Sequence, residues 1–313
     1  MSRQVRTILG DRPADQLGRC DAHEHVWLGG PWVAARLPAL RLDDEAMIVA
    51  ELEDFRAAGG GWVVDTMPTN PARDPAAIAR LARRSGVAIV MATGRHLARY
   101  YPTDDPLLSM RREALARLFI EEIEQGVKER MRCGVIKVAG SAGRLTEAER
   151  EVFIAAAQAQ RRTGCPILTH TEADGTAMQQ VRLLLEHGAD AARLTLSHCD
   201  RNDDRAYHED LLQAGVRLEY DQHFRRLMRG ERYAALEWIA PLTDRYPDQL
   251  MLGMDLARRS YWSRAGGGPG LAWLMRELPR HLRRAGVSEH AMQRLYVDNP
   301  ANAFAFAPVN QAA

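Results

Sequence analysis

Short apolar runs alternate with amphipathic stretches along almost the whole chain. Most of the runs are bounded by glycine or by polar turn residues, contain β-branched side chains, and are short enough to be buried strands. The eight runs are 18–25, 60–67, 87–94, 134–140, 165–171, 193–199, 215–221 and 249–255. We therefore predict eight strands.

The stretches between the runs are rich in alanine, leucine, arginine and glutamate, with the apolar spacing of helices. They are 43–58, 75–85, 109–131, 147–163, 175–187 and 203–214, with further helices at 271–285 and 288–296. Repeated strand and helix predict a parallel sheet closed as a (β/α)8 TIM barrel, in one domain over residues 1–313. A doubly wound open sheet is the alternative, but Gly29-Gly30-Pro31 does not match its glycine-rich phosphate turn.

The fourth run holds a lysine, Lys137, between Ile136 and Val138. A lysine in a buried strand is costly unless it is paired, modified or linked to a metal. Other runs end in side chains that could pair with Lys137 or share a metal ion with it, namely His23, His25, His170, His198 and Asp255. Functional groups of a barrel gather at the C-terminal ends of its strands, so we expect all six residues to meet at one site there.

Four histidines and an aspartate are more ligands than one tetrahedral metal ion needs, so two ions sharing a bridge fit the count better. A neutral, desolvated Lys137 amine can react with carbon dioxide to give a carbamate, an anionic bidentate bridge. The metal pair would then generate a bridging hydroxide, and Asp255 would bind one ion and take the proton. The alternatives are an unmodified Lys137 that reaches solvent and histidines that only form core hydrogen bonds.

The composition of the chain indicates which classes of partner and which compartment to expect. The net charge is +1 and no membrane span is evident, so we expect neither nucleic acid nor membrane as a partner. The first residues have no signal-peptide core, and four scattered cysteines without a CxxC pair suit a reduced compartment. We expect a cytoplasmic homodimer that acts on a small, anionic molecule. His96, His187, His208, His281 and His290 are expected on the solvated surface.

Six short motifs together resemble the phosphotriesterase family of the amidohydrolase superfamily. They are His23-Glu24-His25, Ile136-Lys137-Val138-Ala139, Thr169-His170-Thr171, Ser197-His198-Cys199-Asp200, Gly253-Met254-Asp255 and Asp298-Asn299-Pro300-Ala301. The resemblance implies a distorted barrel with two divalent ions, zinc first and manganese or cobalt as alternatives. By this resemblance His23, His25 and Asp255 hold the buried ion, His170 and His198 the more exposed one, and carboxylated Lys137 bridges them.

The loops after strands 7 and 8 are rich in arginine, and in barrels such loops often form a phosphate site. The candidates for substrate binding are Arg225, Arg258, Arg259 and Tyr261, although arginines on a solvated surface are the alternative. Residues 255–261 resemble the branch of the family that opens phosphorylated sugar lactones. That resemblance implies that Arg258 and Tyr261 contact the phosphate.

The chain departs from the family's organophosphate-cleaving members at two places, which hold Arg201 and Gln222 instead of an acidic residue and a histidine. A lactone needs less help with its leaving group, because the alkoxide stays tethered. We therefore expect a lactonase that opens a phosphorylated sugar lactone by attack of a metal-bridging hydroxide. The alternatives are a phosphotriesterase, an amide or carbamate hydrolase with the same site, or a non-catalytic binding protein.

Overall fold

The structure is a computed structural model that describes residues 3–70, 72–128 and 130–307. Within these ranges, eight parallel strands form one sheet whose spatial order follows the sequence. The strands are β3 (Arg19–Glu24), β4 (Gly60–Asp65), β5 (Ala88–Arg95), β6 (Val135–Ala139), β7 (Ile167–His170), β8 (Leu194–Ser197), β9 (Arg217–Tyr220) and β10 (Leu250–Leu252). Seven lie inside their predicted runs, and β5 extends one residue beyond its run.

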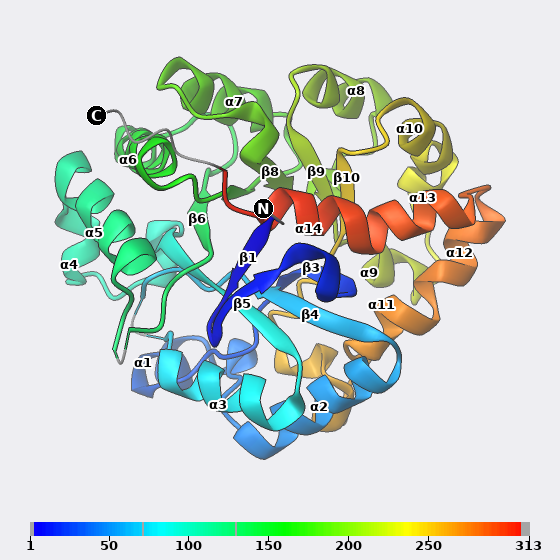
Figure 1. Ribbon diagram of the computed structural model, residues 1–313, viewed down its shortest axis with the longest axis horizontal. Helices are drawn as coiled ribbons and strands as arrows, with labels where there is room; N and C mark the ends of the chain where they lie inside the picture. Colours follow the sequence, from blue (N-terminus) through cyan, green and yellow to red (C-terminus); the bar gives the residue numbers. More distant parts are fainter. Residues whose placement is uncertain (1–2, 71, 129, 308–313) are drawn as a thin grey trace.

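The sheet closes into a barrel with helices outside it, as Figure 1 shows. The closure between β10 and β3 is irregular, because it uses the residues that follow β10. The backbone N–H groups of Met254 and Asp255 donate to the carbonyl oxygen of His23 at 3.3 and 2.8 Å. This confirms the distorted (β/α)8 barrel. The predicted single domain over 1–313 includes residues outside the described ranges and stays a prediction.

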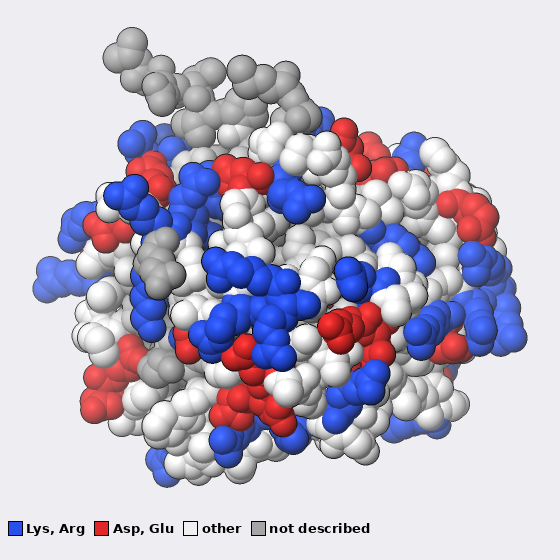
Figure 2. Space-filling view, turned by 60° about the horizontal axis from the view of Figure 1, so that its bottom comes forward, with Lys and Arg blue, Asp and Glu red and all other residues white. Residues whose placement is uncertain are grey.

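The longer outer helices are α2 (Glu45–Ala57), α3 (Pro75–Ser85), α5 (Arg112–Glu124), α6 (Glu147–Thr163), α7 (Ala177–Glu186), α8 (Arg205–Gln213) and α10 (Ile239–Arg245). Thr146 begins α6 with a capping box to Glu149. Figure 2 shows basic and acidic side chains interleaved on the face that includes α2 and α3, as a net charge of +1 suggests. No helix in the described part of the chain is both long and apolar enough to cross a membrane.

Three predicted helices differ from the structure. The one predicted at 288–296 is α13 (Glu289–Gln293) followed by a π-helix over Arg294–Asp298. The helix predicted at 109–131 is shorter, because α5 gives way to a turn at Gly126, whose φ of 87° no helix accommodates. The helix predicted at 271–285 is divided into α11 (Ala272–Arg276) and α12 (Leu278–Arg284). Pro279, in the first turn of α12, has no N–H to continue a helix through Glu277.

An N-terminal hairpin of β1 (Gln4–Thr7) and β2 (Gly10–Pro13), which we did not predict, covers one end of the barrel together with α14 (Asn299–Phe304). Figure 1 shows β1 and α14 crossing the middle of the ring. Val5, Cys20, Trp62 and Phe304 pack there in a buried cluster. All four cysteines are unpaired and buried. The hairpin end of the barrel is therefore filled, and a site has room only at the C-terminal ends of the strands.

Candidate active site

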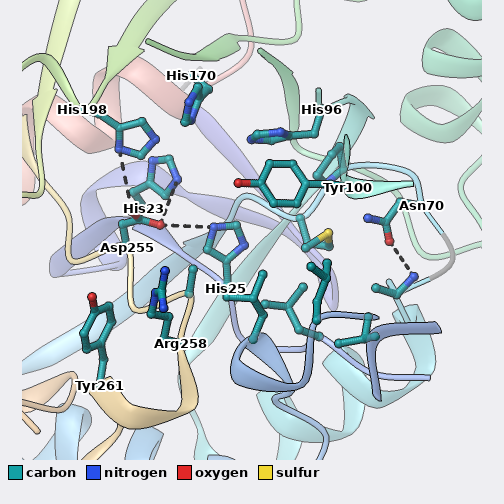
Figure 3. Close-up of a pocket in the computed structure, with 18 of the residues that line it drawn as sticks. His23, His25, Asn70, His96, Tyr100, His170, His198, Asp255, Arg258 and Tyr261 are labelled. Atoms are coloured by element: carbon teal, nitrogen blue, oxygen red, sulfur yellow. Dashed lines mark hydrogen bonds and ion pairs between the residues drawn. The ribbon is translucent and has the colours of Figure 1, made fainter. Parts of the chain in front are cut away.

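A cavity of about 290 Å³ lies at the C-terminal ends of the strands. It collects five of the six predicted metal-site residues, namely His23, His25, His170, His198 and Asp255. His23 lies in β3 and His170 ends β7, whereas His25 and His198 directly follow β3 and β8, and Asp255 lies three residues after β10. Figure 3 shows the side chains of His23, His25 and His198 around Asp255.

The shortest distances within this group run to Asp255. His25 Nε2 lies 3.3 Å and His23 Nε2 4.0 Å from Asp255 Oδ1. One ligand atom from each of these three residues lies within 4.8 Å of the others, so they could hold one metal ion. The ring of His198 is 4.6 Å from that of His23 and 4.7 Å from that of His170. Nε2 of His170 lies 3.1 Å from Glu172 Oε1, so a metal ion there would compete with this carboxylate.

Two of these residues have a strained backbone. His198 and Asp255 have φ values of 62° and 50°, in the left-handed region that side chains with a Cβ rarely adopt. Such a conformation costs about 1–3 kcal/mol and persists only where the surrounding structure enforces it. His198 directly follows a buried strand and Asp255 lies three residues beyond one, and both side chains line the cavity.

Lys137 lies under the floor of the cavity. Its side chain is 1% exposed, and its Nζ is 3.4 Å from Nε2 of His23. Burial lowers the pKa of Lys137 to about 8, although Glu219 and Asp255 favour the charged form. At pH 7 about a tenth of the amine is then neutral, against about one part in three thousand at the ordinary pKa of 10.5. Lys128 and Lys137 are the only lysines among 42 lysines and arginines, and arginine could not supply a neutral amine.

Two carboxylates, one in β9 and one directly after it, accept hydrogen bonds from two of the histidines. Glu219 Oε2 accepts from Nδ1 of His23 at 2.9 Å, and Asp221 Oδ2 accepts from Nδ1 of His198 at 2.5 Å. With Nδ1 as the donor in both rings, each Nε2 carries a free lone pair. Glu219 and Asp221 could themselves join a ligand group with these histidines, but their hydrogen bonds assign them the role of orienting the rings.

The protonation states suit a divalent cation. Burial lowers the pKa of His23, His170 and His198, so their rings are neutral at pH 7. Burial alone would raise the pKa of Asp255, but the contact with His25 and the charge of Arg225 hold it below its usual range. Neutral imidazoles, an ionised carboxylate and a partly neutral lysine are the donor set that such an ion needs, so the residues fit a metal centre.

Three arginines line the cavity, and they differ in what they bind. Arg225 donates to the backbone oxygen of Asp255 at 2.6 Å and to its Oδ2 at 2.9 Å. Arg201 donates to Glu172 Oε2 at 3.2 Å. Arg258 is exposed, and its guanidinium has no hydrogen bond or ion pair to any described residue, so it is available to a ligand. Tyr261 also lines the cavity, whereas Arg259 is exposed and does not.

The prediction that five further histidines lie on the surface is wrong for His96 and His208. His96 follows β5 directly and lines the cavity, with its ring 5.0 Å from that of His170. Its place just after a strand is the same signal that identified His198. His208 is buried, and its Nε2 and Nδ1 lie 2.9 and 2.8 Å from the Asn202 carbonyl and the Tyr220 hydroxyl.

The chain is similar to known proteins along nearly its whole length. A sequence profile described as the phosphotriesterase family matches residues 3–304. The phospho-furanose lactonase of Mycoplasmopsis synoviae is 31% identical, over 96% of this chain and 92% of that protein. The structure of a lactonase from Listeria monocytogenes has a TM-score of 0.90 at 26% identity, covering 97% of this chain and 100% of that one. The Escherichia coli phosphotriesterase homology protein, solved with phosphate in its active site, has a TM-score of 0.85 at 29% identity and covers 93% of this chain and 99% of its own.

Proposed function

The chain belongs to the phosphotriesterase family, and from this premise we propose that it is a metal-dependent lactonase that opens a phosphorylated sugar lactone. The observation that carries the proposal is Arg258, an unpaired guanidinium in the wall of a cavity that also holds the candidate metal ligands. The lactonase names of two relatives and the phosphate bound by a third support it.

We propose that His23, His25 and Asp255 hold one divalent ion, that His170 and His198 hold a second, and that carboxylated Lys137 joins them. Zinc is the first candidate, with manganese and cobalt as alternatives. When bound, such ions supply Lewis acidity toward a carbonyl oxygen and make water more acidic. In forming the carbamate, the Lys137 ammonium first loses one proton to solvent, and the neutral nitrogen then attacks the carbon of carbon dioxide and releases a second proton, so a buried cation becomes an anion.

Side chains of the protein transfer the proton and bind the substrate. Asp255, ionised at neutral pH and beside His25, accepts the proton of the attacking water. It returns this proton to the ring oxygen as the carbon–oxygen bond of the lactone breaks. Arg225 keeps Asp255 oriented through two hydrogen bonds. Arg258 and Tyr261 bind the phosphate, and Arg259 has no part in the proposed contact because it does not line the cavity.

The Glu219→Gln variant should bind metal about 10- to 100-fold more weakly, because an amide cannot accept from His23 Nδ1 with the strength of a carboxylate. Titration against a competing chelator measures this affinity directly and does not depend on turnover. Glu237→Gln, at an exposed position outside the cavity, is the control. Unchanged affinity in Glu219→Gln would show that the hydrogen bond does not orient a ligand.

The Arg258→Ala variant should lose about tenfold to a hundredfold in kcat/KM with a phosphorylated lactone, because a charge-assisted hydrogen bond contributes about 1.5–3 kcal/mol. The loss should nearly vanish with the unphosphorylated counterpart. Arg259→Ala is a matched control, since it removes a neighbouring arginine that does not line the cavity. Equal loss on both lactones, or the same contrast in Arg259→Ala, would reject Arg258 as the phosphate-binding residue.

The function itself is tested with metal-reconstituted protein on a panel of phosphorylated and plain aldonolactones, acylated amines and a phosphate triester. We expect the phosphorylated lactones to have the highest kcat/KM. A preference for amides or for the triester would replace lactonase with one of the alternatives. Triester cleavage is disfavoured because this chain has Arg201 and Gln222 at the two positions where the family's organophosphate-cleaving members have an acidic residue and a histidine. The homodimer stays a prediction, which light scattering at several concentrations would check.

A further inference from the structure

One segment leaves the barrel after β3 and returns before α2. Its ends are joined by two hydrogen bonds between the backbones of Leu28 and Leu42, at 2.8 and 2.9 Å. Between them the segment carries the short helix α1 (Pro31–Arg36) and the 3-10 turn η2 (Pro38–Leu40). The turn η2 contacts η7 (Arg259–Tyr261), which follows β10. The segment therefore reaches across the mouth of the cavity.

This segment and the loop after β4 make one side of the cavity apolar. We call the following eight residues the apolar wall: Leu28, Trp32, Val33, Leu37, Leu40, Met67, Pro68 and Ala72. The charged side chains of the cavity lie elsewhere. In Figure 3, Arg258 and Tyr261 lie on the Asp255 side of His25, whereas Asn70 and Tyr100 lie on the other. One side of the cavity is thus apolar, and Arg258, Tyr261 and the candidate metal ligands line the same cavity.

The apolar wall is preformed. The loop after β4 is tied to the segment by the hydrogen bond from Gly29 N to the Ala72 carbonyl, at 3.2 Å. Next to it, Arg73 and Glu122 form a buried ion pair at 2.7 Å, and Thr69 donates to the same carboxylate at 2.7 Å. A buried, hydrogen-bonded ion pair is costly to break, so the loop has little freedom to move away. The binding of a ligand therefore requires no rearrangement of this surface.

A sugar phosphate without an apolar substituent would form few favourable contacts with the apolar wall. Its hydroxyl groups need hydrogen-bond partners once they leave water, and the eight side chains of the apolar wall supply none except the indole N–H of Trp32. An alkyl or aryl group gains from the same contact in proportion to the apolar area that it buries. Trp32, Leu37 and Leu40 are only half-buried, so they still present apolar area for such a contact.

We propose that the preferred substrate is an anionic lactone that also carries an alkyl or aryl substituent, with the substituent packed on the apolar wall and the anion at Arg258. The proposal rests on the lactonase function above and specifies its substrate class. The lactone is then held by two recognition groups, one for its anion and one for its apolar substituent. This two-point binding selects against small lactones that have only one of the two groups.

The test compares two phosphorylated γ-lactones that differ by one n-butyl group. The metal-reconstituted protein should prefer the butyl compound by about tenfold or more in kcat/KM, as hydrophobic pockets commonly discriminate. In Leu37→Ser, which makes the wall polar at a half-buried position, this preference should fall by about tenfold. Leu185→Ser, at an exposed leucine on α7, is the matched control and should keep the wild-type preference. No preference in the wild-type protein, or an unchanged preference in Leu37→Ser, would overturn the proposal.

Calorimetry with the ring-opened hydroxy acids separates this proposal from the lactonase function, because it needs no turnover. The butyl hydroxy acid should bind at least about tenfold more tightly than its parent, and Leu37→Ser should remove the difference. If the wild-type protein opened neither lactone but still bound the butyl acid more tightly, the lactonase function would fail and the apolar subsite would stand. If both lactones were opened at equal rates and both acids bound equally, the subsite would fail and the lactonase would stand.

Discussion

Replacing Lys137 with alanine should lower kcat/KM by roughly a thousandfold or more, because several kcal/mol of metal-centred stabilisation would depend on the proposed carbamate bridge. The side chain is buried beside His23, and no other described lysine could replace it. The loss should be accompanied by loss of bound metal, which elemental analysis measures. Lys128→Ala removes the other lysine, which is exposed, and should be indistinguishable from the wild-type protein.

Chemical rescue distinguishes a missing bridge from general damage to the barrel. A short carboxylic acid such as propionate offers two oxygens and can occupy the space that Lys137 leaves, so it should restore part of the activity of Lys137→Ala. It should not restore a variant that lacks a histidine ligand. A carbon-13 spectrum of the active, metal-loaded wild-type protein should contain a carbamate resonance after growth or incubation with labelled bicarbonate. A bare amine in that active protein would contradict the carbamate bridge.

The second large effect is expected for Asp255→Asn, which should lower kcat by about a hundredfold to ten-thousandfold even when metal is saturating. An asparagine oxygen can still act as a ligand, but the amide cannot accept and return a proton. Arg225 would also lose its ionised partner. The rate at full metal occupancy is the decisive measurement, because the pKa of Asp255 is held below its usual range and its protonation does not limit the wild-type rate near neutral pH.

Asp248→Asn is the control for the loss of one aspartate, since Asp248 is largely exposed and does not line the cavity. It should keep the wild-type rate and pH profile. If Asp255→Asn with full metal occupancy kept the wild-type rate, another group would have to move the proton. Asp255 would then remain a ligand only.

Much of the site could be predicted from the sequence because its residues share one local signal, a polar side chain at or just after an apolar run. His170 ends β7, and His198 and Asp255 follow β8 and β10 within a few residues. A parallel barrel brings all such ends to the same face, so local patterns were enough to predict a common site. The same signal, applied to β5, would have identified His96.

The rest depends on contacts between segments far apart in the sequence. Glu219 lies in β9 and meets His23 of β3, a pairing that follows only from barrel closure. The N-terminal hairpin has no long apolar run and is stabilised by packing against α14. Arg225 was predicted to bind substrate, and the structure pairs it with Asp255 instead of leaving it free. Which arginine remains unpaired is a tertiary property, and it distinguishes Arg258 from Arg225.

Elemental analysis of the protein after reconstitution with zinc or manganese tests the proposed metal centre most directly. The ligand set of four histidines, Asp255 and carboxylated Lys137 predicts about two divalent ions per chain in the active wild-type protein. One ion or none, in protein that hydrolyses its substrate at full rate, would contradict the two-metal centre and the bridging role of Lys137.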